Sequence, residues 1–353
     1  MSNLIKVLVT DDSAFMRKVI TDILNREPGI KVVDTARNGQ EALEKIKQYE
    51  PDVVTLDVEM PIMDGITALQ HIMKEHPRPV LMLSSLTQEG AELTFKALQL
   101  GAVDFIAKPS GNISLDIEKV ALDIVQKVKI AAQVKTGKLG FTPSWQPTPI
   151  VKKVISGDRV LEKIVMIGTS TGGPKALHEV IPKLPGDLNA AVVLVQHMPP
   201  GFTRSLAERL DQLSALRVKE AEHGEEVVPG TVYIAPGDYH LLFRSHQEAG
   251  RKRLYVELSK NSQVNGHRPA VDPMLFSMGD TFWSNQMVAV IMTGMGSDGA
   301  QGLAFIKDKG GRTVAEDQSS CVVFGMPKAA IATGKVDRVI PLMEIAQEIT
   351  RLL

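Results

Sequence analysis

Short apolar segments that read as β-strands recur through the first third of the chain. They cover residues 5–10, 30–36, 53–57, 80–85 and 103–108. The stretches between them place apolar side chains three and four positions apart, which is the spacing of one helix face. A final helix is expected through Ile117, Val120, Ile124 and Val128. Alternating strands and helices favour right-handed crossovers, so we expect an α/β domain with a doubly wound, five-stranded parallel sheet.

A second series of strands and helices follows a segment rich in proline, glycine, serine and lysine. Expected strands cover residues 163–168, 190–196, 231–236, 287–292 and 311–316, with a hairpin built from HLLF and LYVEL. The polar segment predicts a linker over residues 131–158. We therefore expect one domain over residues 1–130 and a second, larger doubly wound parallel-sheet domain over residues 159–353.

Composition narrows the class of protein. Among 353 residues, 40 Lys and Arg balance 41 Asp and Glu, so no excess of positive charge indicates a nucleic-acid partner. No segment approaches the run of about 18 apolar residues that spans a bilayer, and the N-terminus lacks a signal-peptide core. The one cysteine, Cys321, cannot form an intrachain disulfide. We expect a cytoplasmic protein without membrane insertion.

Polar side chains follow four of the expected strands in the first domain. Asp11 and Asp12 follow the first strand, Asp57 ends the third, Ser84 ends the fourth and Lys108 ends the fifth. Parallel strands end at one edge of a sheet, so these side chains should lie together. A lone aspartate at a strand end is more often a helix cap. Polar residues at four strand ends instead favour a Mg²⁺ site. There Asp57 would attack a phosphoryl group, and Lys108 would neutralise the charge of the phosphoryl oxygens.

The motifs around these residues, DD, DVEMPIMDG and GAVDFIAKP, resemble the receiver domain of two-component response regulators over residues 4–128. The resemblance implies a flavodoxin-like fold with Asp57 as the phosphoacceptor and Ser84 and Lys108 supporting the phosphoryl group. It assigns the Mg²⁺ ligands to Asp11, Asp12, Asp57 and Glu59, the last through its backbone carbonyl. It also implies a histidine kinase as phosphodonor and a cis peptide between Lys108 and Pro109.

Three residues suited to nucleophilic catalysis follow strands of the second domain. Ser170 lies in GTSTGGP, where glycines permit a sharp turn between strand and helix. His197 follows one expected strand in QHMPPG, and Asp298 follows another in TGMGSDGA. Taken singly, each has a commoner explanation as a phosphate-binding turn, a hydrogen-bonded histidine or a helix cap. Together at one sheet edge they predict a triad of nucleophile, general base and orienting acid.

The other seven histidines lack this placement. The chain order of serine, histidine and aspartate differs from that of α/β-hydrolases, so the GxSxG pattern alone does not place the domain there. Backbone N–H groups of Met295 and Thr171 are the expected oxyanion hole.

The motifs GTSTGGP, QHMPPGFT, GHRPAVDPMLFS and TGMGSDGA occur in this order behind the receiver. The whole chain thereby resembles the chemotaxis protein-glutamate methylesterase family, CheB. The resemblance implies hydrolysis of glutamate methyl esters and deamidation of glutamines on methyl-accepting chemotaxis receptors, with no cofactor in the esterase site. It also implies activation by phosphate from a chemotaxis histidine kinase. We expect a monomer in which the unphosphorylated receiver covers the edge that carries Ser170.

Two alternatives remain at this point. The GMGSDG turn also fits the GxGxxG fingerprint of an NAD-dependent oxidoreductase, with Glu316 and Asp317 as the acidic partner of a ribose. That motif should open a nucleotide-binding half, yet few residues follow Gly299. A response regulator whose second domain only binds a partner or DNA is the other alternative, which the neutral charge disfavours.

Overall fold

The computed structural model describes residues 4–85, 87–108, 113–134, 161–248, 251–279, 281 and 286–353. Its contacts divide the chain into two compact units, Met1–Trp145 and Gln146–Leu353. Most of the expected linker lies outside the described residues, as does Pro109 with its expected cis peptide. Among the described helices, none combines the length and apolar character needed to cross a membrane.

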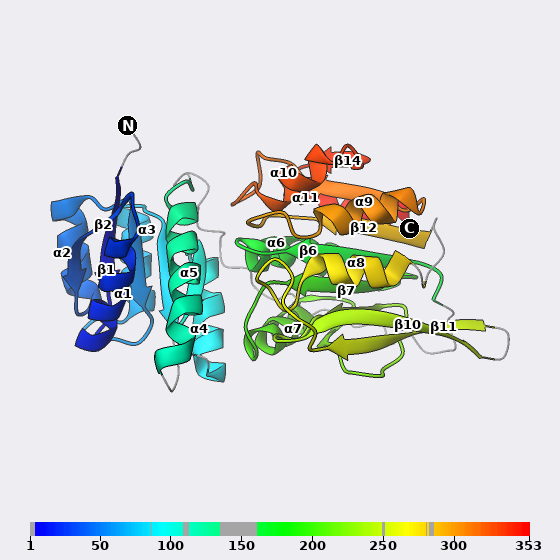
Figure 1. The fold of residues 1–353 in the computed structure, drawn as a ribbon, viewed down its shortest axis with the longest axis horizontal. Coiled ribbons are helices and arrows are strands. Elements are labelled where there is room, and N and C mark those ends of the chain that lie inside the picture. The colour runs from blue at the N-terminus through cyan, green and yellow to red at the C-terminus, as the bar shows by residue number, and fades with distance from the viewer. Residues whose placement is uncertain are drawn as a thin grey trace. The chain divides into compact units, whose positions relative to one another are not determined.

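The first unit, drawn in blue to teal in Figure 1, contains a five-stranded parallel sheet. Its strand order is β2-β1-β3-β4-β5. Its strands are β1 (Ile5–Thr10), β2 (Ile30–Ala36), β3 (Val53–Asp57), β4 (Val80–Ser84) and β5 (Asp104–Ala107). Its helices are α1 (Ala14–Arg26), α2 (Gly39–Tyr49), α3 (Gly65–Glu75), α4 (Gln88–Gln99) and α5 (Ile113–Ala131). Helix α1 contacts α5, whereas α3 contacts α2 and α4, so the helices form two layers. The predicted doubly wound α/β arrangement is confirmed.

Side-chain caps start three helices of this unit close to the carboxyl ends of the strands. Ser13, Asn38 and Asp64 each accept a hydrogen bond from a backbone N–H in the first turn of α1, α2 and α3. Gly65 then allows the chain to turn back closely, because a Cβ there would lie 1.9 Å from the carbonyl oxygen of Asp57. The segment between β3 and α3 thus folds tightly against the end of β3.

The second unit contains a seven-stranded parallel sheet in the order β14-β13-β12-β6-β7-β9-β8. Its strands are β6 (Ile164–Thr169), β7 (Ala191–Gln196), β8 (Arg217–Glu220), β9 (Thr231–Ile234), β12 (Met287–Ile291), β13 (Arg312–Glu316) and β14 (Arg338–Ile340). Strands β10 (His240–Glu248) and β11 (Arg251–Ser259) form a separate antiparallel hairpin that contacts helix α8 (Figure 1). The predicted larger parallel sheet and the hairpin are confirmed.

Two layers of helices cover this sheet. One contains α8 (Val271–Gly279), α9 (Ala300–Asp308) and α10 (Met326–Ala332). In this layer α9 contacts both α8 and α10. The other contains α6 (Gly173–Val180), α7 (Phe202–Leu213), α11 (Leu342–Leu352) and the short 3₁₀ helix η2 (Ile181–Lys183), which links them. Apolar strands such as β6 and β7, buried along their whole length, lie between the two layers.

The sequence prediction missed β8 and β14, the two edge strands of the second sheet. Each is short, and β14 leaves two of its three side chains exposed, so neither shows the continuous apolar run of a central strand. Strand β6 lies between β7 and β12, so the chain leaves it in one direction and later returns on its other side. A crevice is expected at this switch point.

Candidate functional site

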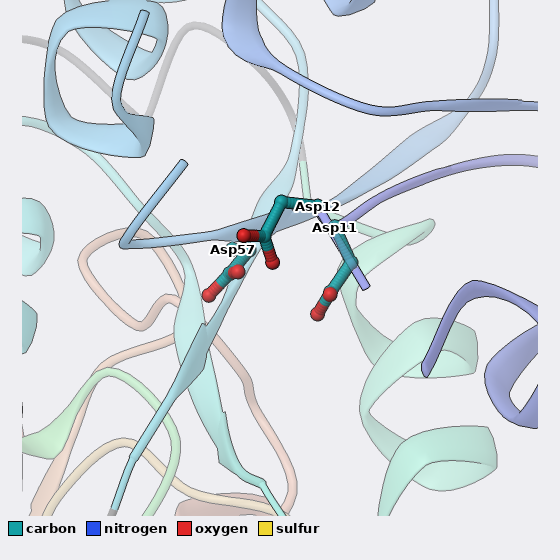
Figure 2. A group of neighbouring side chains, drawn as sticks. All are labelled: Asp11, Asp12 and Asp57. Carbon is teal, nitrogen blue, oxygen red and sulfur yellow. The ribbon is translucent and has the colours of Figure 1, made fainter. Parts of the chain in front are cut away.

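Three aspartates gather at the carboxyl edge of the first sheet. Asp11 and Asp12 directly follow β1, and Asp57 is the last residue of β3, the strand paired with β1. One carboxylate oxygen from each lies within 4.8 Å of the others. Figure 2 shows the three side chains extending from these neighbouring segments into a common region. Asp11 and Asp57 are buried and Asp12 is exposed, so the cluster is open to solvent on one side.

Lys108 reaches this cluster from the end of β5. Its ammonium Nζ lies 2.7 Å from Asp57 Oδ1 and 3.0 Å from Asp11 Oδ2. Burial raises the pKa of Asp57 to about 6, with the charges of Asp11 and Asp12 acting in the same direction and Lys108 opposing them. The buried Oδ2 of Asp57 has no hydrogen-bond partner among the described residues. An orphaned carboxylate oxygen beside two further carboxylates fits a hard divalent cation such as Mg²⁺.

The other residues expected around Asp57 lie close to it in sequence or in the sheet. Ser84 ends the neighbouring strand β4, but its buried hydroxyl donates to the carbonyl of Gly90 at 3.0 Å, so in this structure it is engaged within its own loop. Glu59 is exposed, two positions after Asp57. Arg17 was not predicted: its guanidinium donates to the backbone carbonyls of Asp11 and Asp12 at 2.8 and 2.9 Å.

Ser170, His197 and Asp298 meet at the switch point of the second sheet. They follow β6, β7 and β12, three adjacent strands. His197 Nε2 lies 2.7 Å from Asp298 Oδ2, and the exposed fraction is 5% for the His197 side chain and 2% for that of Asp298. His197 Nδ1 is buried and has no hydrogen-bond partner in the described part of the chain. The structure thus pairs His197 with Asp298 through Nε2 but forms no hydrogen bond between His197 Nδ1 and Ser170.

The surroundings of Asp298 keep its carboxylate charged. Oδ2 also accepts from the backbone N–H of Val271 at 2.7 Å, and Oδ1 accepts from that of Asp272 at 3.0 Å. Burial alone raises the pKa of Asp298, but the hydrogen bond from His197, its charge and the two backbone bonds hold that pKa below its usual value. An anionic Asp298 favours a proton on His197 Nε2, which leaves Nδ1 able to accept a hydrogen bond.

Asp298 and Asp272 cap each other's helices. Asp298 binds the first two N–H groups of α8, and Asp272 from α8 accepts from Gly302 N, in the first turn of α9, at 2.7 Å. This compensates for Gly299, the N-cap residue of α9, which has no side chain. Burial, together with the nearby charge of Asp298, raises the pKa of Asp272 to about 6. The sequence prediction did not single out Asp272, which lies in the motif GHRPAVDPMLFS.

His267 lies against the triad, although no strand end places it there. Its ring stacks on that of His197, with centroids 3.9 Å apart and an interplanar angle of 25°. A two-residue turn positions His267. Val264 and His267 exchange backbone hydrogen bonds of 3.0 and 2.9 Å. The residues between them, Asn265 and Gly266, both have positive φ. The sequence prediction considered histidines only at strand ends and so did not single out His267. The NG turn in VNGHRPAVDP was the available signal.

The GMGSDG turn packs closely against Ser170. A Cβ added to Gly294 would lie 2.8 Å from Ser170 Cβ, so the following Met295 is carried close to Ser170. The N–H of Met295 makes no hydrogen bond within the described ranges. Thr171, the other expected oxyanion donor, is buried at the turn into α6. Both N–H groups therefore lie in segments adjoining Ser170.

The same geometry argues against a dinucleotide at this turn. Glu316 is fully buried and accepts hydrogen bonds from Thr293 N at 2.8 Å and Ser320 Oγ at 2.9 Å. Its carboxylate therefore supports the loops around Thr293 rather than facing a ribose. Asp298, inside the motif, is bonded to His197.

Known proteins match both units. The family model described as CheB methylesterase matches residues 165–349, and the response regulator receiver domain model matches residues 7–117. A protein-glutamate methylesterase/protein-glutamine glutaminase of Syntrophomonas wolfei is 56% identical over 99% of both chains. One of the same name from Thermotoga maritima is 49% identical over 99% of this chain and 98% of its own.

A solved structure resembles the second unit. The CheB methylesterase catalytic domain of Thermotoga maritima aligns with a TM-score of 0.52 and 50% identity. The alignment covers 55% of this chain and all of the catalytic domain. The likeness is thus at the level of both sequence and fold.

Proposed function

Because the chain belongs to the CheB methylesterase family and carries a response-regulator receiver domain, we propose that Ser170, His197 and Asp298 hydrolyse glutamate methyl esters on chemoreceptors. The observation that carries these roles is the 2.7 Å bond between His197 and Asp298, at the same edge of the sheet as Ser170. We divide the chain into a receiver over residues 1–130, a linker over 131–158 and a catalytic domain over 159–353.

The proposed esterase step would use these three side chains and two backbone N–H groups. Ser170 Oγ attacks the ester carbonyl as its proton passes to His197 Nδ1, and Asp298 stabilises the imidazolium that forms. The N–H groups of Met295 and Thr171 stabilise the oxyanion. Methanol leaves with the proton from His197, and water then hydrolyses the acyl-serine by the same proton transfers. A glutamine side chain would release ammonia by the same route, which gives the deamidase activity.

The receiver step is a phosphoryl transfer to Asp57. Its carboxylate attacks the phosphorus of a phosphohistidine on a chemotaxis histidine kinase, while Lys108 stabilises the transferring oxygens. Asp11, Asp12, Asp57 and the Glu59 carbonyl would hold Mg²⁺, which when bound supplies further charge neutralisation. Ser84 would contact the phosphoryl group after leaving Gly90. We place the enzyme in the cytoplasm as a monomer, where it meets the kinase and the methylated receptor region.

Methanol release tests the enzymatic assignment. Purified full-length protein is incubated with a methylated chemoreceptor fragment, and methanol is quantified by gas chromatography. We expect methanol from the methylated fragment, none from the unmethylated one, and ammonia from a fragment carrying glutamine at those positions. Absence of methanol with a substrate known to be methylated would contradict the proposed function.

Mg²⁺ binding should depend on pH through Asp57. Because the pKa of Asp57 is about 6 without metal, affinity should fall about tenfold per pH unit below that value. The raised pKa also means that the folded receiver binds a proton more tightly than the unfolded chain. Stability of the metal-free receiver should therefore decrease as pH rises from about 4 through about 6. Calorimetric titration with Mg²⁺ between pH 5 and 8 measures the affinity.

The Asp57→Asn variant is the control for that titration, because it keeps the shape of the side chain without its proton equilibrium. Its Mg²⁺ affinity should be weaker and should change less between pH 5 and 7. An equal pH dependence in both proteins would assign the proton to another group.

Removing the receiver should raise basal esterase activity. We propose that the unphosphorylated receiver restricts access to Ser170, as expected for a regulatory domain. A fragment starting near residue 150 should then hydrolyse methylated receptor faster than the unphosphorylated full chain. Circular dichroism of the fragment checks that the catalytic domain is folded. An equal or lower rate from a folded fragment would exclude inhibition by the receiver.

A further inference from the structure

One buried amide links the nucleophile to the general base. Gln196 is the last residue of β7 and is 2% exposed. Its Nε2 donates to the backbone carbonyl of Ser170 at 3.0 Å and to that of His197 at 3.1 Å. Its Oε1 accepts from the hydroxyl of Thr169 at 2.7 Å. A single side chain therefore contacts both residues of the proposed proton transfer.

The partners determine which way this amide faces. Both carbonyl oxygens can only accept, so the NH₂ group must point at Ser170 and His197, and Oε1 must point at Thr169. A Cβ on Gly173 would lie 2.0 Å from Oε1, so the glycine leaves the space that the amide fills. Gly173 N also donates to the Ser170 carbonyl at 2.7 Å, which closes the turn after the nucleophile.

The Gln196 amide connects the two segments just beyond the last paired residues of β6 and β7. The paired register of β6 and β7 ends at Thr169 and Gln196, and His197 N makes a last bond to the Thr169 carbonyl at 3.2 Å. Beyond that point the two segments diverge into loops. The two hydrogen bonds from Gln196 Nε2 connect the first residue of each loop, Ser170 and His197. Errors of about 1 Å in such positions can cost about a hundredfold in rate.

We propose that Gln196 is a positioning residue that sets the distance and orientation between Ser170 and His197 in the esterase reaction. The proposal rests on the proposed roles of those two residues. Gln196 does not touch substrate in this mechanism, so its removal should slow the chemical step without weakening receptor binding.

The test compares two variants of the full-length protein with a matched control. Gln196→Met keeps the length of the side chain and removes both donors, and Gln196→Glu keeps the shape but places an acceptor against two carbonyls. Thr203→Val is the control, because Thr203 is also fully buried and hydrogen-bonded, to Glu220 and to Gly237 N, away from Ser170. Each protein is assayed for kcat and KM of methanol release, and for its rate of labelling by a fluorophosphonate.

Both Gln196 variants should lose about 10- to 100-fold in kcat and in labelling rate, with KM within about twofold of wild type. Thr203→Val should keep wild-type kcat even if its melting temperature falls. The proposal is overturned if a folded Gln196 variant keeps wild-type kcat, or if its loss is matched by Thr203→Val at equal melting temperature. Absence of methanol release from wild type would instead refute the proposed function itself.

Discussion

Replacing Ser170 with alanine is expected to lower methanol release from methylated receptor by about 10⁴-fold or more. The alanine removes the oxygen that forms the acyl intermediate, and the buried pair of His197 and Asp298 cannot replace it. Phosphorylation of Asp57 should remain at the wild-type level, because that chemistry takes place in the other domain. Methanol release and incorporation of ³²P from labelled kinase are measured on the same preparation.

A Ser170→Cys variant serves as a control for the shape of the turn. It keeps a nucleophilic atom at the same position and should react with a thiol-directed ester analogue. Turnover by Ser170→Ala near the wild-type rate would remove Ser170 from the mechanism.

Replacing Asp298 with asparagine should lower kcat by about 10³- to 10⁴-fold. Asparagine offers one acceptor oxygen where the carboxylate offers two, and its NH₂ group would face either His197 or a backbone N–H of α8. The imidazole then loses the partner that assigns its proton to Nε2 and stabilises its charged form. The free energy of unfolding should also decrease, by about 1–3 kcal/mol, because a buried donor loses its partner.

Asp272→Asn is the matched control for that variant. It can still accept from Gly302 N and leaves the backbone N–H that binds Asp298 unchanged. Its kcat should stay within a few-fold of wild type, whereas Asp298→Asn should lose nearly all activity. Comparable losses in both would indicate that helix capping, rather than orientation of His197, explains the effect.

The positions of the main candidate residues could be predicted because they follow strands. Asp11 follows β1 and Asp57 ends the neighbouring strand β3, and Ser170, His197 and Asp298 follow three adjacent strands of the second sheet. Parallel strands carry such residues to one edge whatever the details of the loops. Placing these residues at one edge of the sheet did not need the order of the strands. The alternation of predicted strands and helices was enough.

Contacts that depend on two distant loops could not be predicted in the same way. His267 reaches His197 through a turn between the hairpin and α8, and Asp272 meets Asp298 only because two helix starts adjoin. Gln196 reads as one more residue of a buried strand, so nothing in its sequence context showed that its amide bridges Ser170 and His197. These three residues contact the predicted site residues, and only the three-dimensional structure shows those contacts.

Burial raises the pKa of both central aspartates, but their partners make the net shifts opposite. Asp57 has an oxygen without a partner and other acids nearby, so its pKa is raised to about 6 despite Lys108. Asp298 has three donors, so its pKa is lowered despite comparable burial. The first arrangement suits a carboxylate that binds a cation and accepts a phosphoryl group. The second suits one that only orients a base.

Control of the esterase by Asp57 is the central claim, and a small-molecule phosphodonor tests it most directly. Methanol release from methylated receptor is measured with full-length protein and Mg²⁺, with and without acetyl phosphate, for wild type and Asp57→Ala. We predict a several-fold rise for wild type and none for Asp57→Ala, whose basal rate should match that of unphosphorylated wild type. An equal rise in both proteins, or phosphorylated wild type no faster than unphosphorylated, would contradict it.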